Sequence, residues 1–188
     1  MSNSILQQSD AVIAVDVQND FCPGGALAVP DGDAVVPVLN EWIAAARAAG
    51  VPVIASRDWH PADHCSFSEQ GGPWPPHCIR DTPGAAFHSE LELPDDAIIV
   101  SKGQAQERDN YSAFDDTGLA DRLRSLGVER LWIGGLALDV CVQATVLDAC
   151  EAGFDTHLVS AATRAVNVSP GDGARALEAM RAAGAQID

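Results

Sequence analysis

The chain has 188 residues, a length typical of one compact domain. Hydrophobic residues make up 47% of the sequence and charged residues 20%, so it can bury a core and extensive disorder is not expected. The 11 basic and 27 acidic residues give a formal charge of −16, which argues against nucleic acid and anionic membranes as partners.

Membrane spans, targeting segments and disulfides are not expected either. The apolar stretch 131–138 is far shorter than the roughly 20 residues that cross a bilayer. Residues 1–10 contain no Lys or Arg and no sustained apolar run, so we expect no secretory signal and a cytoplasmic protein. The five cysteines lack CxxC spacing, which favours free thiols. They are Cys22, Cys65, Cys78, Cys141 and Cys150.

In chain order, short β-branched runs alternate with Ala-rich segments of helical length. This alternation is typical of strand and crossover-helix units in a parallel sheet. Five runs are nearly continuous in apolar character, as expected for strands buried on both faces, and a weaker sixth run ends the chain. The predicted strands are 11–17, 51–56, 97–101, 130–134, 155–160 and 185–187.

The segments between these strands have recognisable helix ends. A glycine follows each one, where a left-handed C-terminal cap would lie. These glycines are Gly50, Gly127, Gly153 and Gly184. Thr117 and Ser169 are expected to cap two helix starts, the second with Asp172 in its first turn. The pattern predicts an α/β fold with three layers, α/β/α.

Segment 57–96 breaks the alternation. It holds six prolines, three glycines and four of the five histidines, and shows no convincing period. Structureless loops of this length are uncommon unless they are functional. With no repeat or linker in sight, we predict one domain over residues 1–188 in which 57–96 is an elaborated loop that binds metal and covers a substrate.

Polar residues follow several of the predicted strands. In open parallel sheets, ligands bind beyond the carboxyl ends of the strands, so residues at these ends can converge. The first strand delivers Asp16, the second leads to Asp58 and His60, the third to Lys102, and the fourth to Cys141.

Cys141 is the candidate nucleophile. It follows Asp139 at the start of a helical segment, where a capping aspartate and the helix dipole are expected to lower the thiol pKa. Lys102 would offset the repulsion between a thiolate and Asp16. Taken singly, these residues could be a buried cysteine, a solvated lysine and a loop-capping acid. Their placement at one rim favours a catalytic set.

A second group of residues could hold a metal ion. Asp58 and His60 alternate in an extended segment and project to the same side, and His77 follows in the same loop. Two imidazoles and a carboxylate suit Zn, Fe or Mn, so we predict one divalent ion, with Zn preferred. His64 is a weaker candidate for a fourth ligand. The alternative is a set of surface histidines.

Two aromatic side chains lie near these groups in sequence. Phe21 follows the Asp16 strand, and Trp74 precedes His77 in a proline-stiffened stretch. They could grip a flat heteroaromatic ligand, or they could belong to the core.

Five motifs occur together over nearly the whole chain. They are Asp16-Val17-Gln18-Asn19-Asp20-Phe21, Arg57-Asp58-Trp59-His60-Pro61, Trp74-Pro75-Pro76-His77-Cys78, Ser101-Lys102-Gly103 and Leu136-Ala137-Leu138-Asp139-Val140-Cys141-Val142. In their order and spacing, the motifs resemble those of the nicotinamidases, a group of the isochorismatase-like cysteine hydrolase superfamily. Isochorismatase-type relatives lack the Trp-Pro-Pro-His-Cys stretch.

The resemblance implies a Rossmann-like, six-stranded parallel sheet and a specific site. The implied catalytic triad is Asp16, Lys102 and Cys141, and the implied metal ligands are Asp58, His60 and His77. A cis peptide between Leu136 and Ala137 is implied, with the Ala137 and Cys141 N–H groups forming an oxyanion hole. The implied substrate contacts are Phe21, Trp74, Leu136 and Ala137.

The implied reaction converts nicotinamide and water to nicotinate and ammonia through a cysteine thioester, as in NAD salvage. A homo-oligomer is compatible with the resemblance. The family usually has Thr at Leu138 and often an aromatic residue at Val140, so another small amide stays open as the substrate. A metal-hydroxide hydrolase, a non-haem iron oxygenase and a non-enzymatic binding module are the alternatives from other classes.

Overall fold

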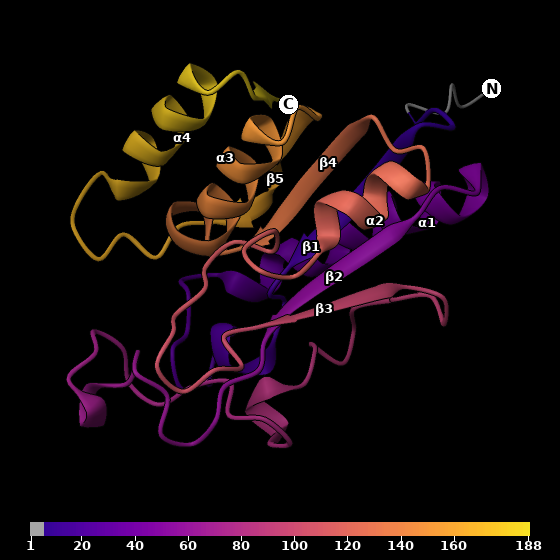
Figure 1. Ribbon diagram of the computed structural model, residues 1–188. Helices are drawn as coiled ribbons and strands as arrows, with labels where there is room; N and C mark the ends of the chain where they lie inside the picture. The colour runs from indigo at the N-terminus through magenta and orange to yellow at the C-terminus, as the bar shows by residue number, and fades with distance from the viewer. Residues whose placement is uncertain (1–5) are drawn as a thin grey trace.

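The computed structural model describes residues 6–188 and contains one six-stranded sheet in which every pairing is parallel (Figure 1). Residues 1–5, half of the stretch considered for a secretory signal, lie outside the described residues. The strands are β1 (Asp10–Val15), β2 (Val53–Asp58), β3 (Ile98–Lys102), β4 (Arg130–Leu136), β5 (Asp155–Arg164) and β6 (Gln186–Ile187). Their order in the sheet is β3-β2-β1-β4-β5-β6, which confirms the predicted fold class.

Helices cover both faces of the sheet, which gives the expected three layers. They are α1 (Val35–Ala49), α2 (Leu119–Ser125), α3 (Gln143–Glu151) and α4 (Asp172–Ala182). In Figure 1, α2, α3 and α4 lie on the near face and α1 lies behind. Strand β1 is buried on both sides because Val12 and Ala14 pack in the cluster with α1, whereas Ile13 and Val15 pack in the cluster with the other helices. This two-sided burial explains its continuous apolar run.

The strand order reverses between β1 and β4, and the chain needs a glycine there. Gly135 has a φ of +129°, and a Cβ on it would lie 2.1 Å from the Val15 carbonyl oxygen. Only a residue without a side chain allows β4 to approach β1 this closely. This switch point is where ligands bind in open α/β sheets.

Helix ends follow the predicted glycines more closely than helix starts follow the predicted caps. Positive φ angles occur at all four glycines: Gly50, Gly127, Gly153 and Gly184. Thr117 accepts the Leu119 N–H at 3.3 Å, as a cap would, although Gly118 is the residue before α2. The expected cap at Ser169 is wrong, because the Ser169 N–H instead donates to the carboxylate of Asp172, the first residue of α4.

Strand β5 is four residues longer than expected. Ile133 pairs with Leu158 but Gly135 pairs with Thr163, so the strand bulges between these pairs. Ser160 lies in the bulge, where its N–H and hydroxyl donate to the Asp188 carbonyl oxygen. This polar residue interrupts the apolar run, so the sequence alone places the end of the strand too early.

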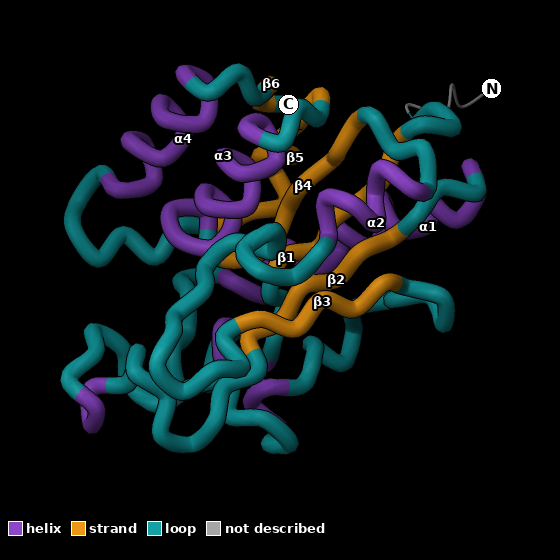
Figure 2. The backbone as a smooth tube through the Cα atoms, viewed as in Figure 1, coloured by secondary structure: helices purple, strands orange, loops and turns teal. Residues whose placement is uncertain are grey.

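The loops that follow β1, β2 and β3 gather beyond the carboxyl edge of the sheet, as the teal segments below the strands in Figure 2 show. Segment 57–96 begins within β2 and contains two short 3-10 turns, Ser68–Gln70 and Pro83–Ala85. Among residues 6–188, no helix has both the length and the hydrophobicity needed to cross a bilayer.

Candidate active site

Three buried side chains meet at the carboxyl edge of the sheet. Lys102, the last residue of β3, places its Nζ 2.7 Å from Asp16 Oδ2 and 3.4 Å from Cys141 Sγ. Asp16 directly follows β1, and Cys141 lies in the π-helical turn Leu138–Val142 after β4. Ser56 on β2 donates to Asp16 Oδ1 at 2.7 Å. The structure therefore brings together the three residues expected from separate strand ends.

A second carboxylate shares the lysine. Lys102 Nζ lies 2.6 Å from Asp58 Oδ1, so one cation bridges Asp16 and Asp58. Burial opposes the charge on Lys102, but the two carboxylates outweigh it and raise the pKa of Lys102 well above its ordinary value. Burial also raises the pKa of Asp58, but Lys102 and His60 outweigh this effect and the pKa is lowered. Lys102 and Asp58 are therefore charged at neutral pH.

The pKa values of the Cys141 thiol and the neighbouring Asp16 carboxyl are both raised, unlike that of Asp58. Burial, with the carboxylates of Asp16 and Asp58, raises the pKa of the Cys141 thiol well above its ordinary value, against the opposing effect of Lys102. The expectation of a lowered thiol pKa is therefore wrong for the free site. Burial also raises the pKa of Asp16 above the usual range, despite Lys102. The resting thiol is protonated and needs a base to become reactive.

The expected cap by Asp139 is also absent, which removes one reason for a low thiol pKa. The Asp139 carboxylate accepts the N–H groups of Val166 and Asn167, at 2.8 Å and 2.7 Å. Neither the π-helical turn nor α3 has a side-chain cap. Asp139 instead fixes the loop between β5 and α4 beside the turn that carries Cys141.

The three expected metal ligands also converge. The candidate ligand atoms of Asp58, His60 and His77 all lie within 4.8 Å of one another, and all three residues are buried. Asp58 Oδ2 lies 3.5 Å from His60 Nε2 and 3.9 Å from His77 Nε2. The carboxylate thus directs one oxygen toward Lys102 and the other toward the two imidazoles.

Both imidazoles are oriented as metal ligands require. His60 Nδ1 lies 2.8 Å from the Gly103 carbonyl oxygen, and His77 Nδ1 lies 2.7 Å from that of Pro75. A ring nitrogen beside a carbonyl must donate, which leaves each Nε2 with a free lone pair. Gly103 also makes room, because a Cβ on it would lie 2.4 Å from His60 Cε1. This donor set fits a divalent ion that accepts nitrogen and oxygen ligands and keeps open positions.

His64 is close to this group but is engaged elsewhere. Its ring stacks on His60 with a centroid distance of 4.0 Å. His64 Nδ1 lies 2.7 Å from Ser66 Oγ, and Nε2 lies 3.0 Å from the Arg108 carbonyl oxygen. Because both ring nitrogens already have protein partners, the structure does not support His64 as a metal ligand. Its ring supports the His60 ring instead.

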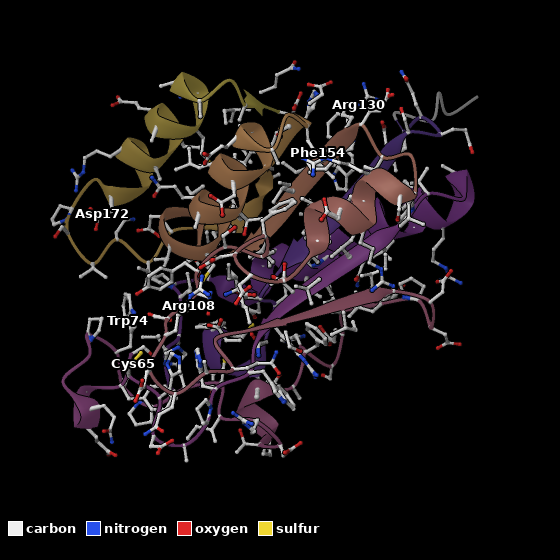
Figure 3. All side chains as sticks on the ribbon, viewed as in Figure 1. Cys65, Trp74, Arg108, Arg130, Phe154 and Asp172 are labelled. Carbon is white, nitrogen blue, oxygen red and sulfur yellow. The ribbon has the colours of Figure 1, made fainter. Side chains whose placement is uncertain are left out.

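A small, partly open and largely apolar pocket opens over both groups. Its lining includes Cys141, Asp58 and His77, and the remaining lining residues are Phe21, Leu27, Val29, Trp74, Tyr111, Ala137, Val140 and Val166. Phe21 and Trp74 thus reach the position expected of them, and Figure 3 shows Trp74 in the loops beyond the sheet. Leu136, an expected substrate contact, is fully buried and does not line the pocket.

The peptide between Leu136 and Ala137 is cis, as the resemblance implied. The Ala137 carbonyl accepts the N–H groups of Val140 and Val142, at 3.1 Å and 3.0 Å. The Ala137 N–H donates to no backbone acceptor among the described residues. Ala137 lines the pocket next to Cys141, so this donor is available there.

Sequence reasoning missed several residues of the site. Tyr111 lines the pocket and its hydroxyl accepts the Trp74 indole N–H at 3.2 Å, yet it lies in a loop with no recognisable motif. Ser56 gave no signal beyond its place at a strand end. Leu138, one of the two departures from the family pattern, packs under α4 and not in the pocket, whereas Val140 lines the pocket.

Comparison with known proteins shows which family the chain belongs to. Residues 10–187 match the family described as Isochorismatase domain. The chain belongs to the isochorismatase family. This member is 42% identical over 198 residues to the nicotinamidase of Escherichia coli (strain K12), covering 94% of this chain and 93% of that protein. The nicotinamidase resemblance is thereby confirmed.

Solved structures agree with this assignment. The pyrazinamidase of Pyrococcus horikoshii in complex with zinc is 47% identical to this isochorismatase-family chain, with a TM-score of 0.92 over 96% of this chain and 98% of that one. PnC1 from L. infantum in complex with nicotinate is 36% identical, with a TM-score of 0.87 over 96% and 92% of the two chains. Both structures confirm the α/β fold.

Proposed function

We propose that the protein hydrolyses nicotinamide to nicotinate and ammonia. The observation that carries the proposal is that Cys141 and the Asp58–His60–His77 group line or adjoin one aromatic pocket, in a chain 42% identical to a nicotinamidase. The nucleophile and the candidate metal group thus face one small ligand. Nicotinate is a precursor in pyridine nucleotide synthesis, so the activity fits NAD salvage.

Asp16 is the proposed general base. Its Oδ2 lies 2.7 Å from Lys102 Nζ, and its Oδ1 accepts the Ser56 hydroxyl at 2.7 Å. Its raised pKa brings it closer to the operating pH, where a carboxyl group can both accept and return a proton. Lys102 offsets part of the negative charge of the site while the proton moves from Cys141 to Asp16. These features support a thiol that becomes ionised only as it attacks.

The chemistry then follows in two halves. The Cys141 thiolate attacks the carboxamide carbon, and the resulting oxyanion is held by the N–H groups of Ala137 and Cys141, each contributing about 3 kcal/mol at the transition state. Asp16 returns its proton to the leaving nitrogen, ammonia departs, and a thioester remains on Cys141. Water gives a proton to Asp16 and its oxygen to the thioester carbon. Nicotinate leaves as the proton returns to the thiol.

Asp58, His60 and His77 are the proposed holders of a divalent ion, and Zn²⁺ is the preferred one. The nitrogen-rich donor set supports this preference, and Fe²⁺ or Mn²⁺ are the other candidates. Such an ion would act as a Lewis acid toward the pyridine nitrogen of the substrate. Phe21 and Trp74 would contact the substrate ring and hold its carboxamide beside Cys141.

Benzamide provides a test of how the substrate ring is recognised. It has the shape of nicotinamide but lacks the ring nitrogen, so its carboxamide would lose the contact that orients it. We expect kcat/KM for ammonia release from benzamide to be at least about 10²-fold below that for nicotinamide. A coupled ammonia assay with both amides measures this ratio. Equal values for the two amides would contradict ring-nitrogen recognition and leave the cysteine chemistry standing.

Metal removal provides the second test. We expect dialysis against a chelator to lower ammonia release from nicotinamide by about 10²-fold, because the ring is no longer oriented. Added Zn²⁺ should restore the rate, whereas Mg²⁺, which prefers oxygen ligands, should not. If the metal-replete protein releases no ammonia from nicotinamide, the substrate assignment itself is wrong.

A further inference from the structure

Strand β1 ends before its neighbour β2 does, and this leaves the last two residues of β2, Arg57 and Asp58, without a partner in β1. The last pair in the β1–β2 register is Val15 with Ser56, and the Asp16 N–H donates to the Ser56 carbonyl at 3.1 Å. Asp16 then has a φ of 49°, so the chain leaves the strand direction. Strand β2 continues to Asp58, whose peptide groups face the same side as those of Ser56.

The side chain of Gln18 fills this gap. Its Oε1 accepts the Asp58 N–H at 2.8 Å, and its Nε2 donates to the Asp58 carbonyl oxygen at 2.8 Å. The same Nε2 donates to the carbonyl oxygen of Ala85, in segment 57–96, at 2.8 Å. Gln18 is fully buried. One side-chain amide thus replaces the peptide group that a longer β1 would have offered.

The amide has only one productive orientation. Both Nε2 protons are used and face carbonyl oxygens, and Oε1 faces an N–H. Rotating the amide by half a turn would set oxygen against two carbonyls and nitrogen against a donor. The contact therefore fixes the backbone of Asp58 in place, at a position where that residue has to satisfy two demands.

Those demands come from the side chain of Asp58. One oxygen lies 2.6 Å from Lys102 Nζ, and the other faces His60 and His77. On the β3 side the backbone is held by strand pairing of Asp58 with Lys102. We infer that Gln18 is a positioning residue that holds Asp58 from the opposite side and thereby sets the affinity of the metal site. The inference rests on the metal site of the proposed function.

The consequence of losing Gln18 follows from burial. Glutamate at this position would keep the shape but lose both donors, and would direct carboxylate oxygens at the Asp58 and Ala85 carbonyls. Methionine would keep the length and lose all three bonds. Groups that orient metal ligands typically change metal affinity by about 10- to 100-fold when they are removed. We expect a loss of this size for Gln18→Glu and Gln18→Met.

Asn19 offers a matched control in the next position. Its Nδ2 donates to the Pro83 carbonyl oxygen at 2.8 Å, so it also ties this turn to segment 57–96, but this hydrogen bond does not involve Asp58. Asn19→Asp removes that donor with the same change of chemistry as Gln18→Glu. We expect its metal affinity to stay within about twofold of the wild type.

The experiment titrates Co²⁺ into the metal-free, full-length protein and its three variants. The visible spectrum of bound Co²⁺ reports both the Kd and the ligand geometry, which a purely structural defect far from the ion would leave unchanged. We expect Gln18→Glu and Gln18→Met to raise the Kd about 10- to 100-fold and to alter the spectrum, with Asn19→Asp resembling the wild type. Circular dichroism confirms that each variant is folded at the titration temperature.

Several results would overturn the inference. Wild-type Kd and spectrum in folded Gln18→Glu or Gln18→Met would do so, as would equal losses in Asn19→Asp. If both Gln18 variants fail to fold, hydrogen exchange of the wild-type Asp58 amide decides, because rapid exchange would show that Gln18 does not hold it. A wild type that takes up no Co²⁺ would end the inference together with the metal assignment. Co²⁺ binding without ammonia release would overturn only the proposed function.

Discussion

Replacing Cys141 by alanine is expected to lower ammonia release from nicotinamide by roughly 10⁴- to 10⁶-fold, the size of loss typical for a covalent nucleophile. The substitution removes the only group in the pocket that we propose to attack the carboxamide. It leaves Asp58, His60 and His77 intact, so Co²⁺ or Zn²⁺ affinity should change little. Initial rates and equilibrium metal titrations on the same preparation measure the two quantities.

Cys65→Ser is the control for this experiment. Cys65 is a partly exposed thiol in segment 57–96 and is not among the residues that line the pocket. Figure 3 shows it in the loops beyond the sheet. Its replacement should leave the rate near that of the wild type. If Cys141→Ala retained most of the activity while Asp58→Ala lost it, the thiol mechanism would be wrong and a metal-hydroxide hydrolase would replace it. Oxygen uptake during turnover would instead favour an oxygenase.

The fold was accessible from the sequence because its signals are local and strong. A strand buried on both faces has to be apolar throughout, as Ala11 to Val15 are, and a left-handed helix end strongly favours glycine, as at Gly50. Where a long-range contact decides, the prediction failed. Ser160 belongs to β5 through a bulge tied to Asp188, which no short window of sequence reveals.

The site was partly accessible for a related reason. The carboxyl ends of parallel strands lie at one edge of the sheet. The positions of Asp16, Lys102 and Cys141 after three such strands therefore predict that they lie close together, as they do. Tyr111 could not, because its loop has no period that fixes its direction. Gln18 lies in the motif that starts at Asp16, but the motif does not reveal its role. That role arises because β1 ends two residues before β2 in their shared register.

The thiol pKa shows where local reasoning goes wrong. A cysteine at a helix start suggests a stabilised thiolate, but Cys141 is buried beside the carboxylates of Asp16 and Asp58, which share the cation of Lys102. The free energy needed to remove a thiolate charge from water is larger than the stabilisation that the dipole of one helical turn provides. The raised pKa favours a mechanism in which proton transfer to Asp16 accompanies attack, and this makes the bridging cation central to the site.

Lys102→Met tests that bridging cation, and we expect it to reduce both activity and stability. The variant leaves the carboxylates of Asp16 and Asp58 buried without their shared cation, and breaking a buried ion pair costs about 3–5 kcal/mol. Activity should fall by at least about 10³-fold, because an unpaired Asp16 is protonated and cannot accept the thiol proton. Arg175→Met, which removes an exposed ion pair with Asp172, should cost about 1 kcal/mol or less.

The pH dependence gives this prediction a definite sign. Without Lys102, burial and mutual repulsion would hold the carboxyl pKa values above those of the unfolded chain, so the folded variant binds more protons than the unfolded one. Its stability therefore rises as pH falls through the raised values. In the wild type, the lowered pKa of Asp58 has the opposite effect, because its stabilisation is lost in acid.

The stability deficit of Lys102→Met is thus expected to be largest near neutral pH and to shrink toward pH of about 4, close to the ordinary carboxyl pKa. Urea unfolding of both proteins in the presence of chelator measures it. Adding Asp16→Asn to the variant should recover part of the lost stability at neutral pH and none of the activity, since one buried charge is gone but the base is gone with it. A deficit that stayed constant across this range would show that Lys102 stabilises the site by packing and not by its charge.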